Sequence, residues 1–489
     1  MSIPPTEPST VPQTPQGPSN RWRLLMTLMV CTIASIMSST IVNVAIPQMS
    51  QHFGLTQDRA QWVSSGFMAA STASMLTTPW LLNRFGYRRT YAGCALLLLV
   101  GGVLGGFAPS FSLVLVARVL EGISAGVVQP LPAIVIMRAF EPHEQGRASG
   151  MFGFGVLLAP ALGPSVGGIL VDLFGWRSIF FMVVPFCVVA LALAPRVVPD
   201  SAPGGVRPNE KAAVDWLGLG LATAGAVLLL NALVHLTSAG GVQALLMLAG
   251  ALAAMAAFVA WQLRQARNPH PHREPLMNLS LFRHRPFALG SVVSLVYGVA
   301  LFGSTYLLPM YLQAGMDLSA SYVGALMLPA GLALAGIIVF TGRMADQHPP
   351  RLMLAIGFVL MAASFAVMPL LGYHTAVIWL VGVTVLGRVG LGFVLPSLNI
   401  GAMRGLDRPQ LAQATSTISF IRTLGGAAGV SLCGVVLQWR LTAHGTALGL
   451  ATPQDIAARM SAFHETFVLL AVMCVLAMVA AWNMRPRGQ

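Results

Sequence analysis

The stretch Tyr91–Pro109 reads YAGCALLLLVGGVLGGFAP and contains no charged residue. An α-helix needs about 20 apolar residues to cross the hydrocarbon core of a bilayer, so this stretch is long enough for one crossing. Backbone polar groups in lipid must be satisfied within the segment, which favours a helix over an isolated strand. Two arginines, Arg88 and Arg89, stand just before it. The stretch therefore predicts a transmembrane helix with a basic flank.

Apolar runs of similar length recur along the whole chain. We count fourteen that are long enough to form a transmembrane helix. They are too long and too weakly alternating in hydrophobicity to be the strands of a membrane barrel. The predicted spans are residues 24–46, 60–82, 91–109, 111–137, 148–171, 178–195, 216–236, 241–262, 286–311, 321–341, 352–371, 376–403, 413–438 and 463–484.

The composition argues against a soluble protein. Of the 489 residues, 56% are hydrophobic and only 9% are Asp, Glu, Lys or Arg, whereas a soluble globular protein carries about 25% charged residues. A net charge of +13 would also fit a nucleic-acid-binding protein. The arginines are, however, dispersed among apolar spans and form no basic patch with interleaved aromatic residues.

Membrane topology explains the basic charge. If the N-terminus is cytoplasmic, 21 of the 28 Lys and Arg residues flank the spans on the cytoplasmic side. The outer side holds only Arg59, Arg177, Arg440 and Arg459. Because Lys and Arg are enriched in cytoplasmic loops, this distribution predicts an even number of spans with both termini inside. Three arginines remain within spans, namely Arg118, Arg388 and Arg422.

The chain also repeats itself. Residues 78–89 link spans 2 and 3 and resemble residues 342–351, which link spans 10 and 11. Arg118-Val-Leu-Glu-Gly122 in span 4 likewise resembles Arg388-Val-Gly-Leu-Gly392 in span 12. Offsets of 263 to 270 residues predict two six-helix halves separated by an inserted pair of helices. Because the insertion is even, both halves keep the same orientation, which is typical of transporters with a site between two bundles.

These patterns predict an all-α polytopic membrane protein with five regions. Residues 1–20 are rich in Pro, Ser and Thr and should form a disordered tail without a cleavable signal. The remaining regions are an N-terminal six-helix bundle at 21–196, an inserted helix pair with flanking cytoplasmic loops at 197–270, a C-terminal six-helix bundle at 271–485 and a short tail at 486–489. All five cysteines lie inside apolar spans without CxxC spacing, which predicts buried hydrophobic residues and no disulfide or metal site.

Several sequence patches, in order and at matching spans, resemble the major facilitator superfamily, specifically its fourteen-helix drug:proton antiporter branch (EmrB/QacA type). The patches are Ser39–Pro47 in span 1, Trp80–Arg89 after span 2, Arg118–Gly126 in span 4, Ala159–Gly168 in span 5 and Ile421–Gly429 in span 13. The resemblance covers residues 22–485 and implies two six-helix bundles, alternating access and a proton gradient as the energy source. It also implies that the span 5 motif serves export.

Two positions depart from the pattern of that branch. Its first-helix motif usually opens with Asp, and Ser38 stands there instead. The motif between spans 2 and 3 often has Gly and Asp where this chain has Pro79 and Asn83. The loss of the first-helix carboxylate leaves the proton-coupling residue open.

Glu121 is the only carboxylate deep within a span, about ten residues into span 4. An ionised carboxylate there is costly unless it is paired or faces a wet cavity. Arg118 stands three residues earlier on the same helical face, within pairing reach. We predict that Glu121 and Arg118 form a proton-coupling site exposed to the chamber between the halves. A permanent structural ion pair is the alternative.

Further polar side chains within spans are candidates for lining the substrate cavity, although such groups often only bond a neighbouring helix. They are Ser38, Asn43, Gln129, Tyr297, Tyr306, Asn399 and Arg422. Arg422 would either meet an anionic substrate, pair with Glu121 or bind helix-end carbonyls, and the resemblance favours a structural or gating role. Arg388 is the repeat mate of Arg118 but has no nearby acid in sequence.

Two groups of residues are candidates for conformational roles. Arg84, Arg88, Arg89 and Asp346 lie in the matched cytoplasmic loops, where they would latch the halves or simply anchor the chain by the positive-inside rule. In span 5, small residues and prolines would permit close packing and bending, or form only a tight helix contact. These residues are Pro160, Gly163, Pro164, Gly167 and Gly168.

The sequence thus predicts proton-driven efflux of amphipathic drugs or lipid-like small molecules across the inner membrane. The alternative is a proton-coupled symporter that imports a small organic solute with the same fold. No ATP, zinc-hydrolase, serine-hydrolase or dinucleotide motif has a credible context, so neither an enzyme activity nor a cofactor is expected. A periplasmic adaptor and an outer-membrane channel are the partners that the resemblance implies.

Overall fold

The computed structural model describes residues 18–55, 57–200, 213–235, 241–268, 275–373, 375–446 and 453–484, and nearly all of these residues are helical. The predicted tails lie outside the described residues, apart from residues 18–20. The helices are α1 (Pro18–Phe53), α2 (Gln57–Met75), α3 (Thr78–Gly106), α4 (Phe111–Val128), α5 (Leu131–Ala139), α6 (Gln145–Phe174), α7 (Ser178–Phe181), α8 (Val183–Val197), α9 (Trp216–His235), α10 (Gly241–Arg267), α11 (Arg285–Met310), α12 (Ala320–Gln347), α13 (Pro350–Val367), α14 (Val377–Met403), α15 (Leu411–Ala443) and α16 (Pro453–Trp482).

Each of the fourteen predicted spans coincides with one of these helices or with two consecutive ones. Among the described residues, eleven helical segments are long and apolar enough to cross a membrane. The other three predicted spans correspond to α2, α6 and α9. The all-helical membrane fold is therefore confirmed, whereas the count of fourteen crossings stays a prediction.

The helix ends differ from the predicted ones mainly near prolines and glycines. The link between spans 2 and 3 is not a loop, because α3 begins at Thr78 and already contains the basic residues of that motif. Gly86 interrupts its helical geometry with φ 77° and ψ 178°, a conformation that costs glycine little. Predicted span 4 is divided into α4 and α5 at Pro130, where a proline removes a helical hydrogen bond.

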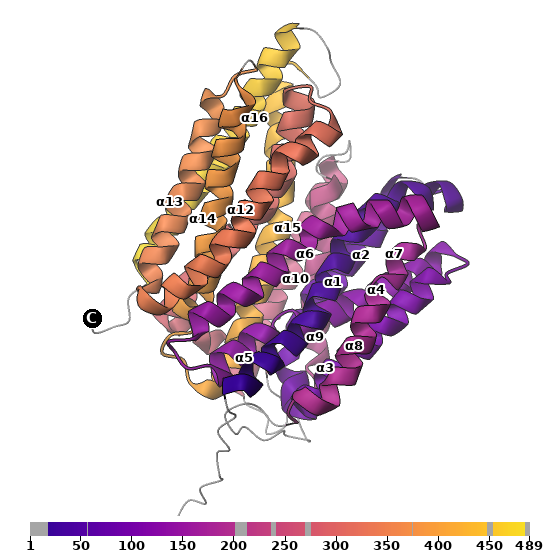
Figure 1. The fold of residues 1–489 in the computed structure, drawn as a ribbon, viewed down its shortest axis with the longest axis vertical. Coiled ribbons are helices and arrows are strands. Elements are labelled where there is room, and N and C mark those ends of the chain that lie inside the picture. Colours follow the sequence, from indigo (N-terminus) through magenta and orange to yellow (C-terminus); the bar gives the residue numbers. More distant parts are fainter. Residues whose placement is uncertain are drawn as a thin grey trace, which may run out of the picture.

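The helices gather in two lobes that meet at one end and diverge toward the other (Figure 1). Helices α1–α8 form the N-terminal lobe. The C-terminal lobe consists of α12, α13, α14 and α16, together with α11 and α15, which pack on these helices. The pair α9–α10 packs together, and α9 also contacts α2 and α15. The inserted helices thus touch one helix from each lobe.

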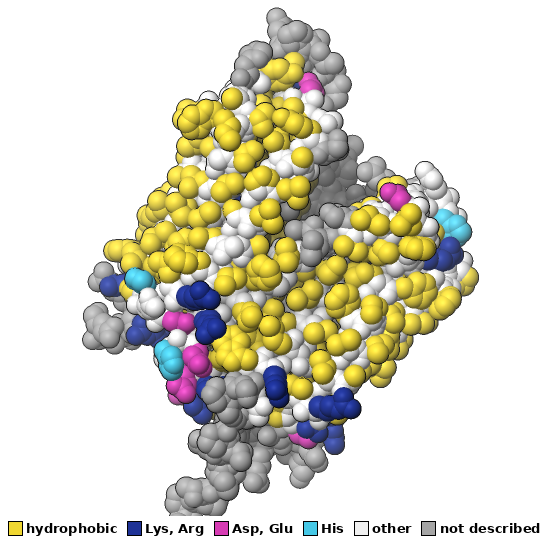
Figure 2. Space-filling model, in the orientation of Figure 1, with side chains coloured by type: hydrophobic (Ala, Val, Ile, Leu, Met, Phe, Trp, Pro, Cys, Tyr) yellow, Lys and Arg dark blue, Asp and Glu magenta, His cyan; other side chains and the backbone are white. Residues whose placement is uncertain are grey.

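Charged side chains gather at the end where the lobes meet. In Figure 2 the flanks of the molecule are mostly hydrophobic, and most visible Arg, Asp, Glu and His side chains lie in a band at that end, with a smaller group at the other. Arg21 there pairs with Glu144 at 3.3 Å, and Arg88 pairs with Asp200 at 2.8 Å. We call this the basic end.

The five cysteines are buried, as the sequence predicts. Cys31, Cys94, Cys187, Cys433 and Cys474 are all free and buried. Their exposed fractions range from 0% to 7%, so they pack as small hydrophobic side chains within the two lobes.

Candidate functional site

An ion pair lies at the centre of the N-terminal lobe. Arg118 Nη1 and Glu121 Oε2 on α4 are 2.6 Å apart. The Ser38 hydroxyl on α1 donates to the same carboxylate oxygen at 3.1 Å and accepts from Arg118 Nη1 at 2.9 Å. Arg118 Nε also donates to the Val63 carbonyl on α2 at 3.1 Å. The cluster therefore ties α4 to both α1 and α2.

Small residues of the span 4 motif bring the helices this close. A Cβ atom on Gly122 would lie 2.5 Å from the Phe67 carbonyl oxygen, and one on Gly126 would lie 2.1 Å from that of Ser71. Glycine at these two positions lets α4 rest directly on the backbone of α2. The ring of Phe67 then lies under the Arg118 guanidinium, 4.3 Å from its centroid, which adds a cation–π contact.

The pair is enclosed and does not face the space between the lobes. The side chains of Arg118 and Glu121 are 2% and 1% exposed. Their pairing is as the sequence predicts, but the predicted exposure to the chamber is wrong for this conformation. The reason is packing, because Glu121 points at Gly101 of α3 and Arg118 reaches between α1 and α2.

The enclosed pair is not fully satisfied. Arg118 Nη2 and Glu121 Oε1 are buried without a hydrogen-bond partner. A buried ion pair is stabilising only when its geometry is good and its remaining polar atoms are bonded. Within the described residues, three of the pair's five side-chain nitrogen and oxygen atoms are therefore bonded and two are not.

Gly101 offers a test of how tightly the site is packed. A Cβ atom there would lie 2.7 Å from Glu121 Cγ and 3.0 Å from the Ala117 carbonyl oxygen. We expect Gly101→Ala to lower the free energy of unfolding by about 1–3 kcal/mol, because the added methyl group overpacks the site. The melting temperature should fall accordingly. The matched control is Gly93→Ala on the same helix, because a Cβ atom there meets nothing within 4 Å. Equal melting temperatures for the two purified variants would contradict this packing.

The other predicted cavity residues do not gather around the Arg118–Glu121 pair. Asn43 is exposed and accepts from the Ser64 hydroxyl at 2.9 Å, and Gln129 is half-buried beyond the end of α4. In the C-terminal lobe, Tyr297 is 0% exposed, Asn399 is 5% exposed and Arg422 is 8% exposed, whereas Tyr306 is half-buried. Only Ser38 joins the Arg118–Glu121 pair.

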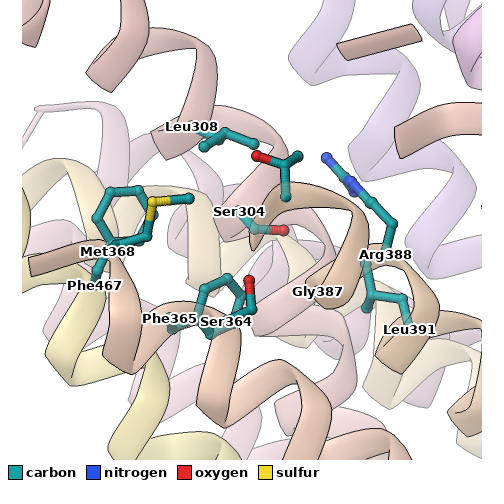
Figure 3. A pocket seen from close by; sticks show the side chains of 10 residues that line it. Ser304, Leu308, Ser364, Phe365, Met368, Gly387, Arg388, Leu391 and Phe467 are labelled. Atoms are coloured by element: carbon teal, nitrogen blue, oxygen red, sulfur yellow. The ribbon is translucent and has the colours of Figure 1, made fainter. Parts of the chain in front are cut away.

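A small pocket in the C-terminal lobe was missed by sequence reasoning. Its volume is about 20 Å³. It is lined by Arg388 together with Ser304, Leu308, Ser364, Phe365, Met368, Thr384, Gly387, Leu391 and Phe467. Figure 3 shows Arg388 across this pocket from Met368 and Phe467. The signal that would have found it is the repeat, because Arg388 occupies the position of Arg118.

Asp346 joins the two lobes at the basic end. Its carboxylate accepts from the backbone N–H groups of Gly146, at 2.5 Å, and Arg147, at 2.9 Å. These N–H groups belong to the first turn of α6 in the N-terminal lobe. A carboxylate at a helix N-terminus satisfies free donors and the positive end of the helix dipole. Asp346 therefore caps a helix of the opposite half.

Backbone contact between α6 and α12 surrounds this cap. A Cβ atom on Gly342 would lie 2.6 Å from the Gly146 carbonyl oxygen and 2.7 Å from Gly150 Cα. One on Gly150 would lie 2.7 Å from the Ile338 carbonyl oxygen. Three glycines thus let the two helices cross in direct contact, and they close the basic end between the lobes.

Arg88 of the first motif bonds within the N-terminal lobe. Arg88 Nε donates to the Val198 carbonyl at 2.8 Å, and its guanidinium pairs with Asp200. Both partners follow the end of α8 in the same half of the chain. Arg84 is half-buried and Arg89 is exposed. Of the residues predicted to latch the halves, Asp346 therefore bonds across the lobes, whereas Arg88 bonds within one lobe.

The span 5 motif packs α6 on α1. A Cβ atom on Gly163 would lie 2.2 Å from Thr40 Oγ1, and one on Gly167 would lie 2.5 Å from Ile41 Cγ1. Gly168 faces open space, Pro160 is half-buried and the side chain of Pro164 lies outside the described residues. The helix runs through both prolines without interruption, so the motif gives close packing without a break in this conformation.

Comparison with known proteins agrees with this fold and these motifs. The sequence pattern of the Major Facilitator Superfamily matches residues 28–430. The chain is 32% identical over 431 residues to a multidrug resistance protein B homolog of Mycobacterium tuberculosis (strain ATCC 25618 / H37Rv), covering 85% of this chain and 77% of that one. It is 27% identical to the multidrug export protein EmrB of Haemophilus influenzae, covering 87% and 82% of the two chains.

Two further comparisons extend over nearly the whole chain. The lincomycin resistance protein LmrB of Bacillus subtilis is 24% identical, with 94% of this chain and 95% of that one covered. The structure of the human organic anion transporter MFSD10 (TETRAN) matches with a TM-score of 0.67 at 14% identity, over 95% and 100% of the chains, and shows a shared fold. The chain therefore belongs to the Major Facilitator Superfamily, in the drug:proton antiporter branch of its multidrug resistance protein B, EmrB and LmrB relatives.

Proposed function

We propose that this transporter exports amphipathic drugs or lipid-like small molecules by proton antiport and alternating access. The observation that carries the proposal is the contact of Glu121 with Ser38 and Arg118 in the interior of the N-terminal lobe. Ser38 stands where the antiporter branch usually has Asp. Since the Ser38 hydroxyl lies 2.9 Å from Arg118 Nη1, Glu121 supplies to this arginine the carboxylate that α1 lacks.

Protonation of Glu121 would change the contacts between helices. The ionised carboxylate attracts Arg118 across 2.6 Å in a poorly hydrated environment, where charge interactions are strong. The neutral carboxyl group loses this attraction and gains a donor. Arg118 would then be held only by the Ser38 and Val63 oxygen atoms and the Phe67 ring. The proton thus biases the packing of α1 and α2 on α4.

The arrangement of the lobes supports an outward-facing state. They meet at the basic end and diverge at the other, where the space-filling view is notched between them (Figures 1 and 2). The excess of Lys and Arg at the basic end supports a cytoplasmic position for it, with both termini on that side of the inner membrane. Inward opening then requires α6 and α12 to separate at the Asp346 cap. In a host with two membranes, a periplasmic adaptor and an outer-membrane channel would complete the route.

The same machinery would also serve a proton-coupled symporter of a small organic solute. Both functions need a protonatable group and two alternating states. The relatives named for multidrug resistance and export favour efflux. The direction of substrate movement relative to the proton gradient distinguishes them.

Transport by the purified protein in lipid vesicles tests this proposal. We expect vesicles with an acidic lumen to accumulate tetraphenylphosphonium, ethidium or decanoate from a panel of amphipathic probes, and to lose protons from the lumen as they do. Nigericin, which collapses the gradient, should abolish accumulation. Accumulation driven only by an acidic exterior would indicate symport, and transport that ignores the gradient for every probe would refute proton coupling.

A further inference from the structure

The C-terminal lobe carries an arginine whose equivalent in the N-terminal lobe is paired with a carboxylate. Arg388 occupies the position of Arg118, but Leu391 stands where Glu121 follows in the N-terminal lobe. Leu391 is 2% exposed, so the side chain at this position is equally enclosed in both lobes. Within the described residues Arg388 forms no ion pair, and its Nη1 donates only to the Thr305 hydroxyl, at 3.3 Å.

Arg422 is a second intramembrane cation for which the described residues provide no counter-ion. It lies on α15, where the carbonyl oxygen of Arg422 would be 2.1 Å from a Cβ atom on Gly298 of α11. In the part of the chain that the structure describes, its guanidinium forms neither a hydrogen bond nor an ion pair. None of its nitrogen atoms is fully enclosed. These donors therefore keep access to solvent-sized space.

Tyr297 lies on α11, the helix that contacts both arginines. It is 0% exposed, next to Gly298, and its hydroxyl has no hydrogen-bond partner among the described residues. The Arg422 backbone packs against Gly298, the next residue on this helix, and Arg388 Nη1 donates to the Thr305 hydroxyl two turns further along it. A buried phenol usually bonds a partner through its hydroxyl. The cluster thus holds two cations and an orphaned donor, and no described carboxylate bonds to any of the three.

Charged side chains inside a membrane protein are costly and normally pair with an opposite charge. Here the missing partner is an anion. We propose that Arg388, Arg422 and Tyr297 bind the anionic head of an amphipathic substrate, such as a carboxylate, sulfonate or phosphate. This inference rests on the proposed export function and specifies the charge of its substrate.

The surroundings fit a headgroup of that kind. Guanidinium groups recognise planar or tetrahedral oxyanions with several donors at once. In the pocket beside Arg388, the hydroxyl groups of Ser304, Ser364 and Thr384 donate to backbone carbonyls, so the guanidinium supplies the donors for an anion there. The pocket volume of about 20 Å³ suits a group the size of a water molecule, such as one headgroup oxygen, and not an alkyl chain. The tail would lie outside it, along the face of α11 where Thr305 is exposed and Phe302 is 39% exposed.

Equilibrium binding with a matched pair of probes tests the site. Decanoate and decyltrimethylammonium have tails of nearly equal length and opposite head charge, and their binding to the purified transporter in phosphatidylcholine nanodiscs needs no pH gradient. We expect the wild type to prefer decanoate. Arg388→Gln and Arg422→Gln should each weaken decanoate binding about tenfold or more, because hydrogen bonds to charged groups are lost. Arg388→Lys should retain most of it.

Leu391→Glu is the sharpest variant, because it recreates the N-terminal pair next to Arg388. It should abolish the preference for decanoate, whereas Leu391→Gln, of the same size but uncharged, should keep it. Arg351→Gln, at the basic end and far from the cluster in sequence, is the matched arginine control. Melting temperature and elution volume establish that each variant is folded.

The outcomes separate this inference from the proposed function. Decanoate binding that is lost in the two arginine variants, in a protein that shows no proton-driven transport, would support the anion site and refute the antiport. Proton-driven transport with equal binding of both probes, or with no decanoate binding to the wild type, would overturn the anion site and leave the antiport standing. Unchanged decanoate binding in folded Arg388→Gln and Arg422→Gln would also overturn it.

Discussion

Gly342→Ala is expected to reduce export strongly, because it disfavours closure of the basic end. The new methyl group would lie 2.6 Å from the Gly146 carbonyl oxygen and 2.7 Å from Gly150 Cα, which are backbone atoms that no rotamer change can move away. Overpacking costs about 1–3 kcal/mol, which changes the ratio of two conformations about 5- to 150-fold. Moving α12 away from α6 to make room for the methyl group would also lengthen the two hydrogen bonds from α6 to Asp346.

Helix α12 contains its own control for this experiment. Gly336 lies less than two turns before Gly342, and a Cβ atom there meets nothing within 4 Å. Gly336→Ala should therefore transport like the wild type. Spin labels on the exposed residues Glu141 and His348 report separation at the basic end, and labels on Ser110 and Gly372 report the opposite end.

In the alanine variant at 342, the distance distribution at the basic end should broaden toward longer values while that at the opposite end shortens. A closed basic end in Gly342→Ala, with wild-type transport, would show that the α6–α12 crossing does not hold the outward-facing state.

Glu121→Gln is expected to remove the dependence of transport on the pH gradient. Glutamine has nearly the same shape and can still accept from the Ser38 hydroxyl, but it cannot take up or release a proton between pH 5 and 9. Gradient-driven accumulation should fall to that of empty vesicles. Equilibrium binding of substrate should stay unchanged, because the site in the C-terminal lobe is separate.

The variant also leaves Arg118 without its counter-ion in a fully enclosed position. Breaking a buried pair by removing one partner costs about 3–5 kcal/mol, so transport must be expressed per folded molecule. Glu121→Asp keeps a carboxylate and should retain part of the coupling. Glu465→Gln is the control, because Glu465 belongs to a partly exposed cluster with Arg440 and His444 at the far end of α15. Full gradient-driven transport by folded Glu121→Gln would make the pair a structural one.

The sequence predicted the helices well because each crossing must contain enough apolar residues to span the bilayer. The Arg118–Glu121 pairing followed from i, i+3 spacing, which fixes neighbours on one helix. Its burial did not follow, since the face that α4 turns toward α1, α2 and α3 is set by contacts such as Gly122 on Phe67. Pairwise packing of this kind involves residues far apart in the chain.

The contact of Asp346 with α6 was beyond sequence reasoning for a similar reason. The sequence showed an acid near a matched basic motif, but its partners are backbone N–H groups about 200 positions earlier, which no side-chain pattern marks. The pocket beside Arg388 was overlooked because its polar lining consists of Ser and Thr residues from different helices, which are common in membrane helices.

The enclosed cysteines have a practical consequence for studying motion. A thiol must reach solvent as thiolate to react with maleimide or methanethiosulfonate reagents. With all five native thiols shielded within the lobes, reporter groups can be attached at newly introduced surface cysteines without first removing the natural ones. Any native thiol that becomes reactive during turnover would then mark a helix boundary that opens as the carrier changes state.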